Sequence, residues 1–576
     1  MTKQPCNPRN YSKYTFPDPR SRDPREHRIQ RLLEMVPGTL TWMTIIGMVV
    51  LSVVAPVAVA VFIIAFDIYW ILRVVYVSWY SRTAHRAMKR GMHADWMMRV
   101  RYAHTPEVLR RRIEQRIARN TQRARDTQCS RADRRAARLA IRSDAYFLKY
   151  TLPFVRAQDV LHHEQVIHAV VLPTATEDAS IIAPSLAAIR DSDYPNDKII
   201  VVLATEERED AQRREEKVRT LRAEFDGVFA DFIVTTHEVA EGELKCKASN
   251  VKYAAKQLMC YFDERGIDYE RVIFSNLDCD SIVHPQYFAA LTWAYITDPK
   301  RLQRAYQPIP MYHNNLWDTN AFVRVVVVSS SFWHMFQSTR REMVTFSSHA
   351  EPFATLVAVD FWPVNMISED SVIYWKCQAY FHGDYEVTPI PLPVSLDAVL
   401  ARTYWGTILN QYRQTRRWAY GIENFPVTMR AIWPDKNMPL WRKIRITFEM
   451  LEGHHSWATT SLMLALLGWM PLWFGGEAFN QSVVAHNLPV VTKMLMTLAL
   501  VGLVAAVFLS FQTLPPRPPR HSRKRYIYMF AQWFLFPITA PFLGSLPAIE
   551  SQTRLLLGKY FGEFWVTEKV RVDKPQ

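Results

Sequence analysis

The pattern of apolar residues gives the chain two membrane-like ends around a central region of different character. Residues 39–80 are overwhelmingly apolar, about twice the length that one membrane-spanning helix needs. Pro56 interrupts this run, so it predicts a helical hairpin. Asp67 and Arg73 lie in the second helix, where an ionisable group is a functional candidate. Packing against protein or snorkelling toward water would explain these two residues equally well.

The second membrane-like region lies near the end of the chain. Residues 457–474 and 488–511 are each apolar enough to span a bilayer. The loop between them has no Lys or Arg, whereas the segment PPRPPRHSRKR follows the second run. By the positive-inside rule the loop is outside and the basic segment inside. Residues 526–549 are also long enough to cross, but three prolines interrupt them, so a re-entrant or interfacial element is the alternative.

Residues 166–280 show a different pattern. The apolar runs VIHAVVL, KIIVVLA, DFIVTT and RVIFSNL alternate with stretches of helical composition. This alternation predicts β-α-β units and a mixed, mainly parallel sheet. Ligands of such sheets bind beyond the carboxyl ends of the strands. The loops PTATED and DCD, after the first and fourth runs, are therefore expected to face one crevice.

Composition and charge support membrane embedding. The chain is 49% hydrophobic and carries a net charge of +15. Residues 82–156 hold 20 Arg or Lys against 6 Asp or Glu, which places this segment in the cytoplasm. Its Ala- and Arg-rich composition predicts a basic helix lying on anionic membrane lipids, and a solvated connector helix is the alternative. Because the segment directly follows a membrane hairpin, it meets lipid first, and no nucleic acid partner is expected.

The ends of the chain and the cysteines add little chemistry. Residues 1–37 are polar and contain several prolines, which predicts a mostly disordered cytoplasmic tail without the apolar core of a signal peptide. The six cysteines are scattered, with no C-x-x-C pair. A reduced compartment and the absence of a zinc site are expected.

Candidate chemistry begins at Asp278 and Asp280, which end the fourth apolar run. Two carboxylates at the end of a strand can converge on Mg²⁺ or Mn²⁺, cations that prefer hard oxygen ligands and keep positions open for phosphate oxygens. A bare D-x-D also occurs by chance in a chain of this length, so two solvated turn aspartates are the alternative. Farther along, Glu369 and Asp370 precede an amphipathic helix, where Ser368 is positioned to cap the start.

Six short motifs occur together and in order: PTATED at 173–178, LKCKASN at 244–250, DCD at 278–280, SED at 368–370, Q-x-x-R-W at 414–418 and FWVTEK at 564–569. With them, most of the chain resembles the membrane-integrated family 2 glycosyltransferases, the group that includes bacterial cellulose and hyaluronan synthases. The resemblance implies an α/β GT-A domain, a divalent cation and inverting transfer from a nucleotide sugar, with UDP the expected nucleotide. It also implies a multi-pass protein of the inner (plasma) membrane with a cytoplasmic catalytic domain.

The resemblance also implies roles for individual residues. Asp370 would be the general base, because the acceptor hydroxyl needs a carboxylate within hydrogen-bond reach. Arg417 would offset charge on the departing diphosphate. The remaining roles are the nucleoside or nucleotide for Thr174, Glu177, Asp178 and Lys247, the diphosphate for Asp278, the cation for Asp278 and Asp280, the acceptor for Glu369, Gln414 and Trp418, and a gating loop for Thr567 and Lys569.

Two departures from the family pattern bear on function. Thr415 stands where the family has Gln or Arg, which leaves the choice of substrate open. In the family this motif lies between membrane helices, whereas FWVTEK here lies almost at the C-terminus. A terminal β-strand is therefore the alternative to a gating loop.

The sequence therefore predicts a membrane glycosyltransferase, a hexosyltransferase of family 2 type, that extends a polysaccharide. One alternative transfers a single sugar to a polyprenyl-phosphate or other lipid, and another is a catalytically silent membrane scaffold. The predicted divisions are a tail (1–37), a transmembrane hairpin (38–80), a basic helical segment (81–160), a GT-A catalytic domain (161–435), an interfacial helix (436–456), a C-terminal transmembrane region (457–549) and a C-terminal segment with FWVTEK (550–576).

Overall fold

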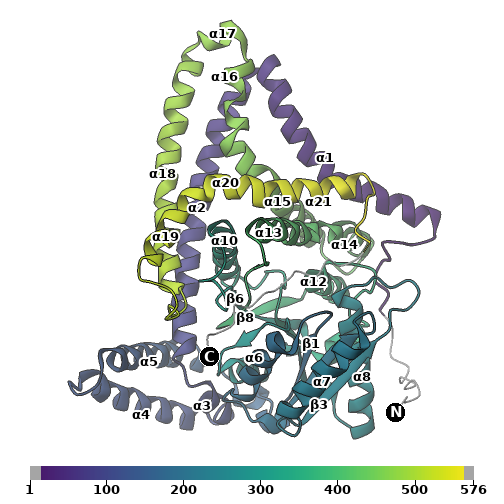
Figure 1. Cartoon of the computed structure of the whole chain (residues 1–576), viewed down its shortest axis with the longest axis vertical. Coiled ribbons are helices and arrows are strands. Elements are labelled where there is room, and N and C mark those ends of the chain that lie inside the picture. Colours follow the sequence, from purple (N-terminus) through teal and green to yellow (C-terminus); the bar gives the residue numbers. More distant parts are fainter. Residues whose placement is uncertain (1–13, 563–576) are drawn as a thin grey trace.

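The computed structural model describes residues 14–562 and shows an α/β domain at one end of a group of long apolar helices (Figure 1). Its strands form one sheet. They are β1 (Ile167–Pro173), β2 (Ile199–Glu206), β3 (Asp231–His237), β4 (Val272–Asn276), β5 (Ile282–Val283), β6 (Arg304–Met311), β7 (His349–Pro352) and β8 (Glu386–Ser395).

The α-helices lie on both sides of this sheet and in the apolar group. They are α1 (Pro24–Val54), α2 (Pro56–Met92), α3 (Trp96–Arg101), α4 (Pro106–Arg125), α5 (Arg131–Tyr150), α6 (Ala179–Arg190), α7 (Ala211–Phe225), α8 (Lys247–Arg265), α9 (Tyr287–Thr297), α10 (Ala321–Gln337), α11 (Phe353–Ala358), α12 (Glu369–Tyr380), α13 (Tyr404–Ala419), α14 (Asn424–Ile432), α15 (Leu440–Ala465), α16 (Met470–Phe474), α17 (Gly476–Asn480), α18 (Val483–Thr513), α19 (Arg525–Ala531), α20 (Phe536–Ala540) and α21 (Leu546–Leu556).

The sheet is mixed and mainly parallel, which confirms the predicted class of sheet. Its strand order is β3-β2-β1-β4-β7-β6-β8-β5. The four predicted apolar runs are the parallel strands β1 to β4, and β7 pairs antiparallel with both β4 and β6. Because β1 and β4 are parallel neighbours, with Val171 opposite Asn276, the loops that follow them leave the same edge of the sheet. This edge carries PTATED and DCD, as the sequence predicted.

Alternating apolar side chains bury both faces of the sheet. In β1, Val170 and Leu172 pack in one core with residues of α6 and α9, and Ala169 and Val171 pack in a second core with residues of α8, α11 and α12. Successive side chains of a strand point to opposite faces, so a run such as VIHAVVL can fill both cores. The buried sheet therefore provides a rigid base for the loops at its carboxyl edge.

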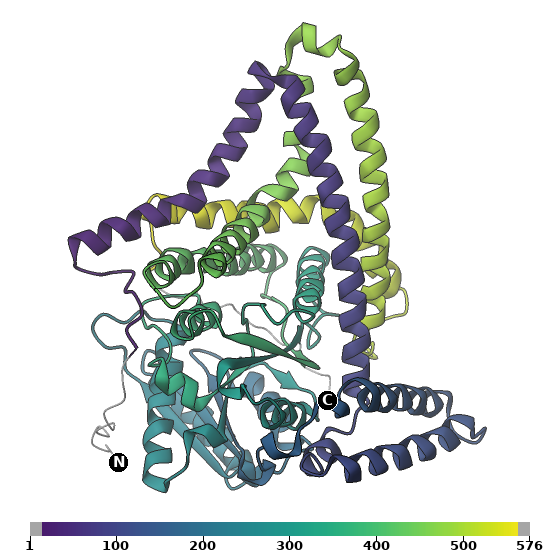
Figure 2. The same cartoon turned by 180° about the vertical axis from the view of Figure 1, so that it is seen from behind.

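Several helices are long and apolar enough to cross a membrane. By length and composition they are Pro24–Val54, Pro56–Met92, Val483–Thr513 and Arg525–Leu556, and the pair Leu440–Ala465 and Leu467–Phe474, bent by 51°, is a further candidate. Figures 1 and 2 show the turn between α1 and α2 at the same end of the molecule as α17, the end remote from the sheet. The predicted outside loop therefore lies opposite the α/β domain.

Among these candidates, the helical stretch Arg525–Leu556 runs in a different direction from the others. In Figure 1, α20 and α21 run across the group of apolar helices, between that group and the α/β domain. This course agrees with the interfacial alternative for residues 526–549. The carboxylate of Glu550 on α21 lies 2.7 Å from Arg416 Nη1 on α13, and it also accepts a hydrogen bond from the Tyr412 hydroxyl at 2.9 Å. This contact ties α21 to the helix that bears Q-x-x-R-W.

Two predicted boundaries are wrong. Residues 24–37 belong to α1 and not to a disordered tail, because Asp23 caps the helix by accepting hydrogen bonds from the backbone of Arg25 and Glu26, and Pro24 suits the first turn. The division at residue 456 is also wrong, because α15 continues without a break from Leu440 to Ala465. Its composition changes from amphipathic to apolar with no helix-breaking residue at that point.

The basic segment forms a helical hairpin of α4 and α5. The carboxylate of Asp144 on α5 is buried and holds Arg116 of α4 at 2.6 Å. Figures 1 and 2 show the hairpin beyond the end of α2 that is opposite the α1–α2 turn. Contact between this hairpin and anionic lipids is not shown by the arrangement, so the lipid partner stays a prediction.

Candidate active site

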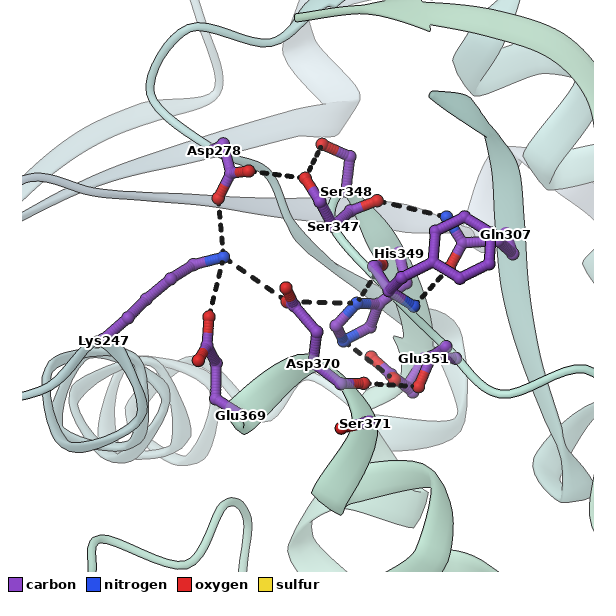
Figure 3. A network of polar contacts seen from close by, with 12 residues as sticks. Lys247, Asp278, Gln307, Ser347, Ser348, His349, Glu351, Glu369, Asp370 and Ser371 are labelled. Carbon is purple, nitrogen blue, oxygen red and sulfur yellow. Dashed lines mark hydrogen bonds and ion pairs between the residues drawn. The ribbon is translucent and has the colours of Figure 1, made fainter. Parts of the chain in front are cut away.

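Polar residues from four separate elements meet at the carboxyl edge of the sheet (Figure 3). Asp278 follows β4 by two residues, and Lys247 is the first residue of α8. Glu369 and Asp370 open α12. Ser347 lies just before β7 and donates a hydrogen bond from its hydroxyl to Asp278 Oδ2. The structure therefore brings together LKCKASN, DCD and SED, although Lys247 lies 31 residues from Asp278 and 123 residues from Asp370 in the chain.

Lys247 is the centre of this cluster. Its ammonium Nζ lies 2.7 Å from Asp278 Oδ1, 3.4 Å from Glu369 Oε1 and 3.4 Å from Asp370 Oδ1. Burial alone would lower the pKa of Lys247, but the carboxylates of Asp278, Asp370 and Glu369 together raise it above its ordinary value. Lys247 therefore stays protonated among the three acids.

The two acids of SED differ in access to solvent. The side chain of Glu369 is 4% exposed and that of Asp370 is 27% exposed. Burial, with a smaller contribution from neighbouring Asp370, raises the pKa of Glu369 to about 7. Asp370 is therefore the more accessible of the two acids to an entering hydroxyl group, and the roles of both stay predictions.

The predicted cation site is only partly arranged. Asp280 is 2% exposed, and its Oδ2 accepts a hydrogen bond from the backbone N–H of Asp397 at 3.0 Å. Within residues 14–562, no group of three or more His, Cys, Asp or Glu side chains is placed to hold a metal ion. Carboxylates suit Mg²⁺ or Mn²⁺ chemically, so the two aspartates fit such a cation if diphosphate oxygens and water complete its ligands.

The Q-x-x-R-W residues lie on α13, beside the acids. Arg417 lies close enough to Glu369 to lower the pKa of that carboxyl, against the larger effect of burial. The Trp418 ring lies 6.3 Å from the ring of Tyr312 and packs against the first core. Gln414 is buried, and the Thr415 hydroxyl donates to the backbone carbonyl of Gln411. Thr415 thus bonds within its own helix.

The PTATED loop is held by its own glutamate. Glu177 Oε2 accepts hydrogen bonds from the Thr174 hydroxyl at 3.1 Å, from Ala175 N at 2.8 Å and from Thr176 N at 3.1 Å. Thr174 also accepts a bond from Lys217, and Asp178 stands at the N-cap of α6. Glu177 therefore shapes the loop itself, and contact of Thr174, Glu177 or Asp178 with a nucleoside stays a prediction.

Sequence reasoning missed a residue that holds the SED turn. A single oxygen of Glu423, Oε1, accepts hydrogen bonds from Ile367 N, Ser368 N and the Ser368 hydroxyl, each at 2.8 Å. The expectation that the Ser368 side chain caps α12 is wrong, because its hydroxyl bonds to Glu423 instead of to a backbone N–H of the helix. Glu423 lies 55 residues from Ser368, and no short-range pattern marks it.

Substitution of Glu423 should destabilise the SED turn in a way that depends on the substituent. Glu423→Ala leaves two backbone N–H groups without their acceptor, and we expect a loss of about 3 kcal/mol or more. Glu423→Gln keeps the oxygen that accepts all three bonds, so its loss should be much smaller. Thermal melting of the purified protein compares them, and equal losses for both variants would contradict the role of this oxygen.

Thr567 and Lys569 lie outside the described residues. The described chain ends close to the site, because the Phe561 ring lies 4.5 Å from the ring of Tyr420, the residue that follows α13. The gating role of FWVTEK stays a prediction.

The chain matches no model of a protein family and no curated protein. Solved structures with some similarity include a mannosyltransferase, PcManGT from Pyrobaculum calidifontis in complex with GDP-Man and Mn²⁺, at 17% identity and a TM-score of 0.37, over 68% of this chain and 88% of that one. Another is S. aureus TarS 1–349 in complex with UDP-GlcNAc, at 12% identity and a TM-score of 0.32, over 69% and 93%. At these scores the likeness carries no weight for function.

Proposed function

We propose that this protein is a membrane glycosyltransferase with a GT-A catalytic domain that transfers a sugar, with inversion, from a UDP-sugar to a growing glycan. The observation that carries the proposal is the gathering of DCD and both acids of SED around the Lys247 ammonium at the carboxyl edge of a mainly parallel sheet. Ligands of such sheets bind at that edge. A buried cation beside an exposed carboxylate suits an anionic donor and a hydroxyl acceptor.

The chemistry requires a separation of charge among these residues. Asp370 accepts the proton of the acceptor hydroxyl while the hydroxyl oxygen attacks the anomeric carbon. The bond between that carbon and the diphosphate breaks, and its electron pair leaves on the diphosphate oxygen. Lys247 and Arg417 offset this charge, and Asp278 and Asp280 would hold Mg²⁺ or Mn²⁺, which supplies further positive charge when bound.

The acceptor would lie along α13 and the start of α12. Trp418 offers an aromatic face for a sugar ring, and Gln414 and Glu369 offer hydrogen-bond partners. α21 crosses between α13 and the apolar helices, so α13 lies on the side of the α/β domain that faces those helices (Figure 1). We place the α/β domain in the cytoplasm and the chain in the plasma membrane, supported by the lack of Lys and Arg in the remote loop.

Product size tests this proposal against its two competitors. Full-length protein in lipid nanodiscs would be incubated with a radiolabelled UDP-sugar and a divalent cation. We expect labelled polymer, as for a polysaccharide synthase. A lipid product with one sugar would replace this proposal by transfer to a polyprenyl-phosphate or other lipid, and no labelled product with any donor would favour a scaffold without activity.

The cation role of Asp280 can be separated from its structural bond. Asp280→Asn keeps an oxygen for the Asp397 N–H but removes the charge. We expect Mn²⁺-dependent UDP binding to weaken about tenfold or more, with little change in melting temperature. Calorimetric titration of UDP with and without Mn²⁺ measures this. Wild-type affinity under both conditions would count against Asp280 as a cation ligand.

A further inference from the structure

Two buried residues of β7 lie behind Asp370 and have no role in the chemistry above. His349 and Glu351 are two positions apart on the strand, so their side chains share one face. They are 0% and 1% exposed. His349 Nδ1 lies 3.7 Å from Asp370 Oδ1, and His349 Nε2 lies 3.2 Å from Glu351 Oε1. Figure 3 shows the imidazole on the side of Asp370 opposite Lys247.

The backbone just before β7 is strained, and this conformation fixes the directions in which the side chains on either side of it point. Ser348 has a φ of 66°, a left-handed conformation that is uncommon for a residue with a side chain. The preceding Ser347 bonds to Asp278, and the following His349 faces Asp370. The Ser348 hydroxyl bonds at 2.8 Å to Ser281, the residue after DCD. Strain of this kind persists where the surrounding structure enforces it, and such positions cluster at functional sites.

We propose that His349 and Glu351 are positioning residues for Asp370: a buried imidazole–carboxyl pair that orients the Asp370 carboxylate toward the acceptor. This inference rests on the proposed function. The pair does not touch the acceptor or the donor, so it would act only through Asp370. Beyond the His349 contact, neither oxygen of Glu351 has a hydrogen-bond partner among residues 14–562.

Burial determines where the protons of the pair reside. Burial, and secondarily the charge of Asp370, raises the pKa of Glu351 well above its ordinary value. Burial lowers the pKa of His349. A protonated Glu351 then faces Nε2 of a neutral imidazole at 3.2 Å, and the ring hydrogen lies on Nδ1. That N–H donates to the carbonyl of Phe346 at 3.0 Å and faces Asp370.

The other groups around the pair leave this assignment unchanged. Tyr287, Cys377 and Tyr385 lie near Glu351, and burial raises the pKa of each, so they stay neutral. The charges that act on His349 are Asp370, Lys247 and Asp278. Among these, the Lys247 ammonium disfavours an imidazolium, and the two carboxylates favour one. The pair therefore adds no net charge to the site, and the Nδ1 edge of the neutral ring lies 3.7 Å from Asp370 Oδ1 while its N–H bonds to Phe346.

Matched substitutions test the pair through turnover. His349→Phe keeps a ring and removes the N–H, and we expect kcat to fall about tenfold or more while the KM for the donor changes less than about twofold. His349→Asn restores an N–H near the Nδ1 position and should recover most of this loss.

Glu351 is tested in the same way. Glu351→Leu removes the partner that fixes the imidazole and should lower kcat, whereas Glu351→Gln offers an N–H to Nε2 and should recover most of the activity. The inference is overturned if His349→Phe and Glu351→Leu retain the wild-type kcat. It is also overturned if both lose activity only in proportion to lost stability, without recovery in the Asn and Gln variants.

A second readout does not depend on turnover. Because the folded state binds the Glu351 proton more tightly than the unfolded chain, wild-type stability should decrease as pH rises above about 4.5, the ordinary range of Glu. Glu351→Gln should reduce this decrease in the melting temperature between pH 5 and pH 8. An unchanged slope would overturn the protonated pair even in an active enzyme. If Glu351→Gln reduces the slope but the wild-type protein has no transferase activity, the proposed function is wrong, while the protonated Glu351 still stands.

Discussion

Asp370→Asn should lower kcat for sugar transfer by about a hundred- to ten-thousand-fold, the usual contribution of a general base. Its carboxylate is the more exposed of the two SED acids, and it can accept the proton of an entering hydroxyl. The amide keeps a similar shape but cannot accept that proton. Donor binding should change less than about twofold, because Lys247 and Asp278 are intact. Initial rates and UDP titration on the same preparation measure both quantities.

The neighbouring carboxylate supplies the matched control. Glu369 is 4% exposed, and we expect Glu369→Gln to lower kcat by about tenfold or less. If Glu369→Gln abolishes transfer while Asp370→Asn retains nearly full turnover, the assignment of the base is wrong. Equal and complete losses in both variants, with normal melting, would mean that the two acids act as one unit.

Lys247→Gln should have the largest effect on both stability and donor binding. The ammonium lies within 3.4 Å of all three carboxylates, and its side chain is 10% exposed. Its removal leaves Asp278, Glu369 and Asp370 facing one another, a loss of about 3 kcal/mol. UDP binding should weaken about tenfold or more, because the diphosphate then meets three acids.

The pH dependence of this variant distinguishes charge from packing. Burial raises the pKa of Glu369 to about 7 and the Lys247 ammonium lowers it, so without the ammonium that pKa rises further and the folded protein should lose more stability as pH increases. The melting-temperature deficit of Lys247→Gln should therefore be larger at pH 8 than at pH 5. Lys247→Arg, which keeps the charge, should show a smaller deficit. A melting-temperature deficit of Lys247→Gln that is the same at pH 5 and pH 8 would indicate lost packing alone.

The parallel half of the sheet and the place of DCD follow directly from the sequence. Four apolar runs with helical stretches between them could form only a buried, mainly parallel arrangement, and β1 to β4 match those runs. The strands β5, β6, β7 and β8 were not predicted; β7 has only four residues and β8 contains three prolines. Their pairing depends on contacts that are distant in the chain.

Prediction of the site has the same limit, because its contacts also join residues that are distant in the chain. The motif residues Lys247, Asp278 and Asp370 were predicted, but Lys247 was assigned to the nucleotide alone, because spacing does not reveal that one ammonium meets three acids. Glu423 has no local pattern at all. His349 and Glu351 do carry a signal, since alternate polar residues in a short strand share one face. That signal has meaning only when the face is known to point at Asp370.

Release of nucleoside diphosphate by the full-length, detergent-purified protein, screened over UDP- and GDP-sugars with Mg²⁺ or Mn²⁺, tests the proposed function most directly. We predict that at least one UDP-sugar releases UDP and that the release is lost in Asp370→Asn. No release from any donor, by wild-type protein that melts cooperatively and keeps its pH-dependent stability, would contradict the proposal that this cluster is a glycosyltransferase active site.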